Sequence, residues 1–116
     1  MIEHVLAVVA VRDIDSAREW YETLFDRLPD NTPMASLVEW RLASAAWLQV
    51  TVDRERAGSS LFNVAVEDIE VFVDTARSRG IDFGNIVDAN KGVRLSMVSD
   101  PDGNFITAIG GFREHY

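Results

Sequence analysis

Few side chains in this sequence could do chemistry of their own. There is no cysteine among the 116 residues, so neither a disulfide nor a thiolate metal site can form. The two histidines, His4 and His115, stand near opposite ends of the chain and have no carboxylate partner at a fixed spacing. A Ser-His-Asp order, a glycine-rich phosphate loop and a His-Glu-x-x-His motif are all absent. The sequence therefore predicts no catalytic residue.

The best candidate for paired carboxylates is Asp100 and Asp102, which belong to the segment Asp-Pro-Asp-Gly at residues 100–103. This segment is also a strong hairpin turn, because proline presets φ and Gly103 accepts a positive φ. The turn explains both carboxylates without giving either one a catalytic role.

Composition excludes several partners. The chain is 47% hydrophobic and 26% charged, which is typical of one soluble globular domain, and its formal net charge is −8. An acidic chain without a basic stripe does not favour nucleic acid or an anionic membrane surface. No apolar stretch reaches the roughly 18 residues that span a bilayer. The N-terminus lacks the plan of a secretory signal, so we expect a cytoplasmic protein.

The helices and strands that would position a site are predicted from a segment that occurs twice in the sequence. Val8–Asp15 recurs as Asn63–Glu70, and each copy has a β-branched run, an acidic N-cap and an amphipathic helix. The first copy predicts a strand at 4–11, a helix from Asp13 to about residue 26, a loop around residues 29–33, and strands at 36–42 and 45–52. The second predicts strands at 61–66, 81–87, 93–98 and 104–109, with a helix that begins at Asp68 and ends at Gly80.

The repeat predicts an α+β fold with the plan βαβββ in each half. We expect module one at residues 1–53, a polar linker at 54–60, module two at 61–112 and a tail at 113–116, all in a single domain. Neither half can cover the open face of its own sheet, so the halves should pair, within one chain or across a dimer.

This plan resembles the vicinal oxygen chelate superfamily (glyoxalase I, bleomycin-resistance proteins and extradiol dioxygenases) over residues 2 to about 112. Val11–Asp15 followed by Trp20 and Tyr21 is similar to the family's entry from strand to helix. The segment 100–104 is similar to the family's last hairpin, which is its most specific short motif. The resemblance implies a concave sheet cup with the helices outside.

The resemblance also implies where a metal would bind. Enzymes of this family hold one divalent ion, as a Lewis acid, through His or Gln on the first strand of each module and Glu on the last. A neutral set without carboxylate or imidazole cannot compensate a divalent cation. We therefore expect a member that lacks the metal site and needs no cofactor. The residues at the four positions are Leu6, Gln49, Leu61 and Thr107.

Strand alternation predicts which other side chains share the face of these four positions. We place Arg94 and Ser96 on it because they are the polar set of their strand, and we expect Arg94 to anchor a carboxylate or phenolate. A mostly apolar concavity with a few polar groups is typical of a small-molecule site. A filled core is the alternative, but buried amides and hydroxyls would then need partners. The predicted ligand contacts are Trp47, Gln49, Asn63, Arg94, Ser96 and Thr107.

Together these features predict a metal-independent, homodimeric protein that binds a small aromatic or apolar, antibiotic-like molecule, as bleomycin-resistance proteins do. One alternative is a metal-dependent glyoxalase-like lyase or dioxygenase with displaced ligands such as His4 and Glu39, where Glu39 and Arg41 join the same face. Another is a protein-interaction module that docks a partner on its open sheet face.

Overall fold

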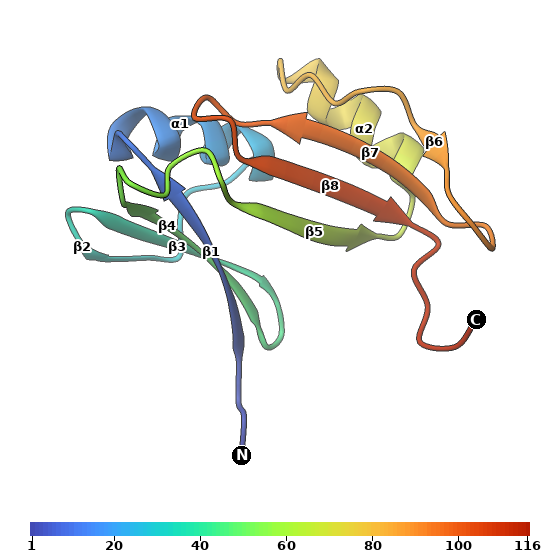
Figure 1. The fold of residues 1–116 in the computed structure, drawn as a ribbon, viewed down its shortest axis with the longest axis horizontal. Coiled ribbons are helices and arrows are strands. Elements are labelled where there is room, and N and C mark those ends of the chain that lie inside the picture. The colour runs from blue at the N-terminus through green and yellow to red at the C-terminus, as the bar shows by residue number, and fades with distance from the viewer. The chain divides into compact units, whose positions relative to one another are not determined.

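A computed structural model describes all residues from Met1 to Tyr116. Two four-stranded mixed sheets, each with one helix, give the predicted α+β fold of two βαβββ modules (Figure 1). The sheets have the same strand order, β1-β4-β3-β2 and β5-β8-β7-β6. None of the helices is long and apolar enough to cross a membrane. The elements are β1 Val5–Val11, α1 Ile14–Phe25, β2 Asn31–Met34, β3 Leu37–Ala43, β4 Ala46–Val52, β5 Leu61–Val66, α2 Ile69–Ser78, β6 Val87–Asp88, β7 Arg94–Ser99 and β8 Phe105–Gly110.

The chain forms two compact units. Unit 1 consists of Met1–Ser60 together with Asp100–Asn104, and unit 2 consists of Leu61–Ser99 together with Phe105–Tyr116. In both units the first strand pairs in parallel with the last, and the remaining pairs are antiparallel. The turn between β7 and β8 thus groups with unit 1, although both of its strands belong to unit 2.

Helix α1 covers one face of the unit 1 sheet. Asp13 caps its N-terminus by accepting from the backbone N of Ser16 at 2.9 Å, and Asp26 ends it in the left-handed conformation at φ 55°. Tyr21 on the helix and Trp40 on β3 are both completely buried, with ring centroids 6.2 Å apart. The alternate residues of the sheet strands supply the rest of this core: Val9, Val11, Val38, Leu48 and Val50.

Helix α2 repeats this arrangement in unit 2. Asp68 caps it through the backbone N of Val71 at 3.1 Å, and Gly80 follows its end with φ 86°. The core beneath it uses β7, β8 and the segment after the helix, where Phe83 packs edge-to-face on Phe72 at 5.6 Å between ring centroids. The completely or nearly completely buried side chains are Ile69, Val73, Ala76, Ile81, Phe83, Val98, Ile106 and Ala108.

Two predicted elements differ from the structure. The loop predicted around residues 29–33 overlaps a strand, because Asn31–Met34 forms β2. This strand pairs only with β3, and an edge strand tolerates a proline because one side of its backbone needs no partner. Conversely, the strand predicted at 81–87 shrinks to Val87–Asp88. Ile81 and Phe83 are apolar because they are buried under α2, not because they pair in the sheet.

The turn Asp100–Asn104 is held in unit 1 by buried hydrogen bonds. The Asn104 side chain donates to the backbone O of Ala10 at 2.8 Å and accepts from the backbone N of Ser60 at 2.9 Å. Gly58 approaches so closely that a Cβ there would lie 2.6 Å from the backbone O of Asp102. The predicted linker at 54–60 is therefore a packed loop, and the carboxylates of the turn serve structure, as the sequence predicted.

Candidate ligand-binding faces

The face of the unit 1 sheet opposite α1 carries the predicted site residues of this unit. Gln49 on β4 lies between Val8 on β1 and Glu39 on β3, and Trp47 lies between Leu6 and Arg41. Cross-strand partners point to the same side of a sheet, so these six side chains share one face. We call it the open face of unit 1, because its members range from half-buried to exposed, whereas Leu48 and Val50 are fully buried on the other face.

The matching face of unit 2 holds Asn63 and Thr107. Thr107 on β8 lies between Asn63 on β5 and Met97 on β7, while Leu61 lies beside Phe105. Ile106 and Ala108, which alternate with Thr107, are buried under α2. We call Leu61, Asn63, Met97, Phe105 and Thr107 the open face of unit 2.

Arg94 and Ser96 lie on the other face of unit 2, so their predicted position was wrong. Ser96 is 1% exposed and donates its hydroxyl to the backbone O of Gly84 at 2.7 Å. The Arg94 guanidinium pairs with Glu70 of α2 at 2.8 Å. The prediction assumed that polar side chains on this strand face the open side. The Ser96 hydroxyl can be buried because a carbonyl oxygen accepts from it.

The sequence held a signal that would have found the correct face. A hairpin closed by residues 100–104 pairs Ser99 with Phe105, and the same register then pairs Met97 with Thr107. Because Thr107 was already assigned to the open face, Met97 must join it, and Arg94 and Ser96 must lie opposite.

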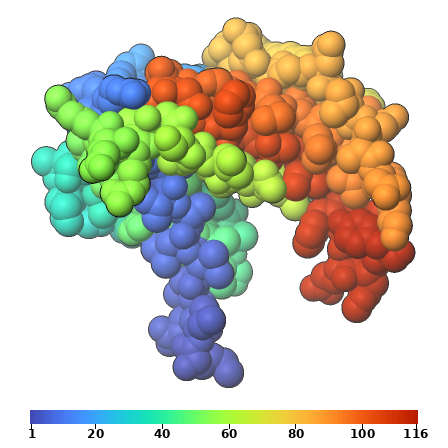
Figure 2. Space-filling model, viewed as in Figure 1, coloured from blue at the N-terminus to red at the C-terminus, as the bar shows by residue number.

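A hollow of about 260 Å³ lies on the open face of unit 1. Its wall includes His4, which precedes β1 in the N-terminal segment. This end of the chain is blue in Figure 2 and projects from the rest of unit 1. Trp47 donates its indole N–H to Nδ1 of His4 at 3.1 Å, so the imidazole accepts at that nitrogen. The lining residues of this unit 1 hollow are His4, Leu6, Asn31, Glu39 and Trp47.

Two amides hold the carboxylate of Glu39 in this hollow. Gln49 donates its Nε2 to Oε2 at 2.6 Å, and Asn31 donates its Nδ2 to Oε1 at 3.2 Å. The sequence predicted Trp47 and Gln49 on the same face. The structure bonds Gln49 to Glu39 and places Trp47 and Glu39 in the wall of one hollow. Asn31 was not predicted as a residue of this site, because its segment was predicted to be a loop.

Arg41 carries the nearest cation on this face. Its guanidinium carbon lies 5.9 Å from the centroid of the Trp47 ring, and its Nη2 donates to the backbone O of Ser44 at 2.6 Å. Arg41 forms no ion pair with Glu39 within 4 Å, and it does not line the hollow. The carboxylate and the guanidinium therefore stand on the same face as separate charges.

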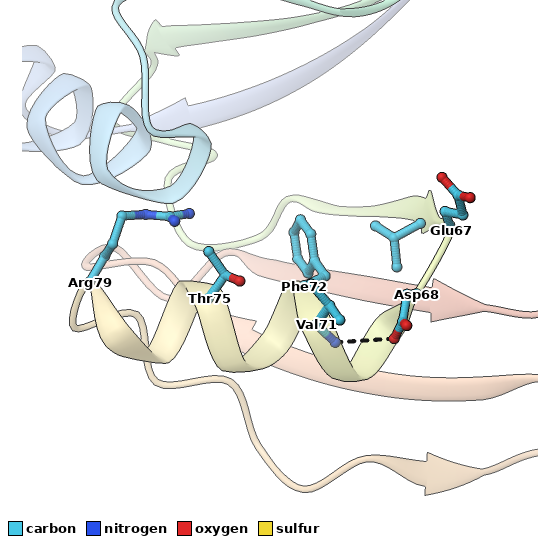
Figure 3. A pocket seen from close by; sticks show the side chains of 7 residues that line it. Glu67, Asp68, Val71, Phe72, Thr75 and Arg79 are labelled. Carbon is cyan, nitrogen blue, oxygen red and sulfur yellow. Dashed lines mark hydrogen bonds between the residues drawn. The ribbon is translucent and has the colours of Figure 1, made fainter.

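A larger hollow, of about 610 Å³, runs along the exposed side of α2 in unit 2 (Figure 3). None of the predicted site residues lines it. Its polar group nearest the helix start, the Asp68 carboxylate, already caps α2, and Phe72 also packs on Phe83. This hollow is a groove beside a surface helix in which the named groups have structural roles. It is lined by Val66, Glu67, Asp68, Val71, Phe72, Thr75 and Arg79.

Solved structures with the same fold are numerous, although no protein-family model and no curated protein matches the sequence. A glyoxalase / bleomycin resistance protein from Catenulispora acidiphila is 29% identical over 92% of this chain and 96% of that one, with a TM-score of 0.85. An antibiotic binding protein from Streptomyces sp. CB03234 is 18% identical over 95% and 96%, with a TM-score of 0.76. A lactoylglutathione lyase from Agrobacterium tumefaciens is 18% identical over 92% of both chains, with a TM-score of 0.73.

The tandem βαβββ modules and these likenesses show that the chain has the fold of the vicinal oxygen chelate superfamily and resembles its members. Within it, the structural neighbours include both the glyoxalase/bleomycin resistance type and an antibiotic binding protein. The predicted resemblance and the predicted fold class are confirmed.

The residues at the family's metal positions do not fit a divalent ion. The first and last strands pair in the same register in both units. Leu6 pairs with Trp47 as Leu61 pairs with Phe105. Gln49 and Thr107 also occupy equivalent positions, each two residues further along its strand. Two aliphatic chains, one amide and one hydroxyl supply neither negative charge nor an imidazole. No group of three or more His, Cys, Asp or Glu side chains is arranged to hold a metal.

Proposed function

We propose that this protein binds a small aromatic or apolar molecule on the open face of unit 1, without a metal and without changing the molecule chemically. The observation that carries the proposal is the unit 1 hollow, in which an indole ring, an aliphatic side chain and an oriented carboxylate converge. Its volume of about 260 Å³ is just below the usual range of drug-sized sites, about 300–1,000 Å³. It suits an aromatic ring with short substituents.

Asn63 and Thr107 stay a separate proposal, as ligand contacts on the open face of unit 2 considered by itself. Asn63 is exposed and Thr107 half-buried, and neither side chain makes a hydrogen bond within the chain. An amide and a hydroxyl that are free to bond on an apolar face are the type of polar groups that orient a small ligand. Arg94 and Ser96 are no longer proposed as contacts, since they lie on the sheet face opposite Thr107.

The alternative is a metal-dependent enzyme in which His4 and Glu39 replace the family's ligands. What favours it is that both side chains line the same hollow. Against it, Nδ1 of His4 accepts from Trp47, which puts the proton of the neutral ring on Nε2. Glu39 is also the only other His, Cys, Asp or Glu side chain that lines the hollow. One-to-one binding of Ni²⁺, Zn²⁺, Mn²⁺ or Fe²⁺ tighter than about 1 μM to chelator-stripped protein would favour the enzyme.

Ligand binding is tested by titrating the chelator-stripped protein with a neutral aromatic probe, 1-naphthalenemethanol, in a calorimeter. We expect saturable binding, and we expect Trp47→Ala to weaken it about tenfold, because stacking and buried area are lost. Leu28→Ala is the matched control, since Leu28 is 68% exposed and does not line the hollow. Absence of binding, or an equal loss in both variants, would refute the proposal.

We also propose that the protein is a homodimer. Several large apolar side chains on the open faces are solvent-exposed in the single chain, including Val8 at 54%, Leu61 at 75% and Met97 at 50%. Large apolar side chains exposed on a sheet face favour association. Light scattering should give twice the chain mass of 13.0 kDa. A mass equal to one chain at micromolar concentration would count against the dimer.

A further inference from the structure

We propose that the molecule bound in the unit 1 hollow is an organic cation, whose positive group binds Glu39 and whose apolar part contacts Trp47. This inference rests on the proposed function, because it names the class of ligand for the same site. The predicted charge of the ligand is opposite to the one that the sequence suggested. Arg94, the expected anchor for an anion, lies on the other face of unit 2 and pairs with Glu70.

Glu39 is the only carboxylate that lines the hollow, and no lysine or arginine lines it. The partners of its oxygens are two neutral amides, from Gln49 and Asn31. No cation of the chain lies within ion-pair distance of Glu39, although seven ion pairs form elsewhere. The amides orient the carboxylate but leave its charge uncompensated.

The geometry leaves Glu39 able to accept from a ligand. An ionised carboxylate has about four lone-pair sites, and the two amides use one on each oxygen. Glu39 is also half-buried beside apolar side chains, where a charge-assisted hydrogen bond is stronger than in open water. An ammonium or amidinium group entering the hollow can thus supply the missing positive charge.

The surroundings of Trp47 also favour a positively charged ligand. The face of an indole ring attracts cations, and Arg41 already lies near this ring at 5.9 Å. Arg41 does not line the hollow, so an anion could reach its guanidinium only outside it. Within the hollow an anion would meet Glu39. The net charge of −8 adds a long-range field that draws cations and repels anions.

Three probes that share one ring test the sign of the ligand: 1-naphthylmethylamine, 1-naphthalenemethanol and 1-naphthoate, which are cationic, neutral and anionic at pH 7. We expect calorimetry to show the amine binding about tenfold more tightly than the alcohol, and the carboxylate binding most weakly. Equal affinities for all three would overturn this inference and leave the proposed function standing. If none of the three binds, the proposed function fails as well.

Glu39→Gln tests whether this carboxylate causes the preference. The variant keeps the shape and removes the charge, so affinity for the amine should fall about tenfold while affinity for the alcohol stays nearly constant. Glu19→Gln is the matched control, since it makes the same change of charge on the exposed surface of α1 and should preserve the preference. An equal effect in both variants would assign the preference to net charge and overturn the role of Glu39.

A measurement on the native chain does not depend on how the variant folds. The Nε2 amide of Gln49 donates to Glu39, so its nuclear magnetic resonance signal reports on that carboxylate. We expect the signal to shift on saturation with the amine and to shift much less with the alcohol. Equal shifts with both probes would place the amine's charge elsewhere and overturn the inference.

Discussion

Replacing Asp100 by alanine should lower the free energy of unfolding by about 3 kcal/mol or more. The Asp100 side chain is 4% exposed and accepts four hydrogen bonds. Oδ2 accepts from the Tyr21 hydroxyl and from Nδ2 of Asn104, both at 2.8 Å, and Oδ1 accepts from the backbone N of Asp102 and of Asn104, both at 2.9 Å. The substitution leaves buried donors without this acceptor, and each one costs about 1–3 kcal/mol.

Equilibrium unfolding in urea at pH 7 measures this loss, and the same turn supplies its control. Asp102→Ala removes a carboxylate two residues away that accepts from the guanidinium of Arg12 at 3.0 Å and from its backbone N at 3.1 Å, where the Arg12 side chain is 57% exposed. This ion pair is near the surface, so we expect a loss of only about 1 kcal/mol. A loss for Asp100→Ala of only about 1 kcal/mol, no larger than expected for Asp102→Ala, would mean that the buried network around Asp100 adds little to stability.

The stability of the protein should fall as the pH rises above about 10, the ordinary pKa of tyrosine. Burial, and then the neighbouring Asp100 carboxylate, raise the pKa of Tyr21 well above this value in the folded state. At a pH above the pKa of Tyr21 in the unfolded chain, the unfolded chain has lost the proton of the Tyr21 hydroxyl, whereas the native chain keeps it. Stability contributed by Tyr21 is therefore fully present below about pH 10 and declines as the pH rises through and beyond it, by up to about 1.4 kcal/mol per pH unit.

Urea midpoints between pH 8 and pH 12 test this expectation, and Tyr21→Phe isolates the group responsible. Phenylalanine keeps the ring that packs against Trp40 but has no proton to lose. The variant should be less stable than the native chain at pH 8, because the hydrogen bond to Asp100 is gone, and it should show a flatter decline above pH 10. If its decline is as steep as that of the native chain, other groups cause the alkaline loss.

Local signals in the sequence were sufficient for most of the fold. Asp13 and Asp68 begin the two helices as predicted, because an N-cap is a contact between residues three positions apart. Gly80 takes the left-handed conformation predicted for it. Trp47 and Gln49 share one sheet face, because alternation along a strand is a property of the backbone itself.

Arg94, Ser96 and Pro33 show where local reasoning failed. The sheet face of Arg94 and Ser96 follows from the register of β7 on β8, and the buried hydroxyl of Ser96 is acceptable only because the carbonyl of Gly84 lies beside it. Pro33 can occupy a strand because β2 lies at a sheet edge. The Gly84 carbonyl and the edge position of β2 cannot be read from the neighbouring residues in the sequence, whereas the register of the hairpin can.

The sequence alone determined the two βαβββ modules, their helix ends and the residues at the positions where the resemblance places a metal, because each depends on repeat spacing, capping or strand alternation. Only the tertiary structure decided that Asn31, Glu39 and Gln49 meet, since they come from three different strands and are joined by their pairing. It also decided that Asp100 accepts from Tyr21, which is 79 residues away in the chain. Long-range hydrogen bonds of this kind depend on how the chain packs, and no local pattern encodes them.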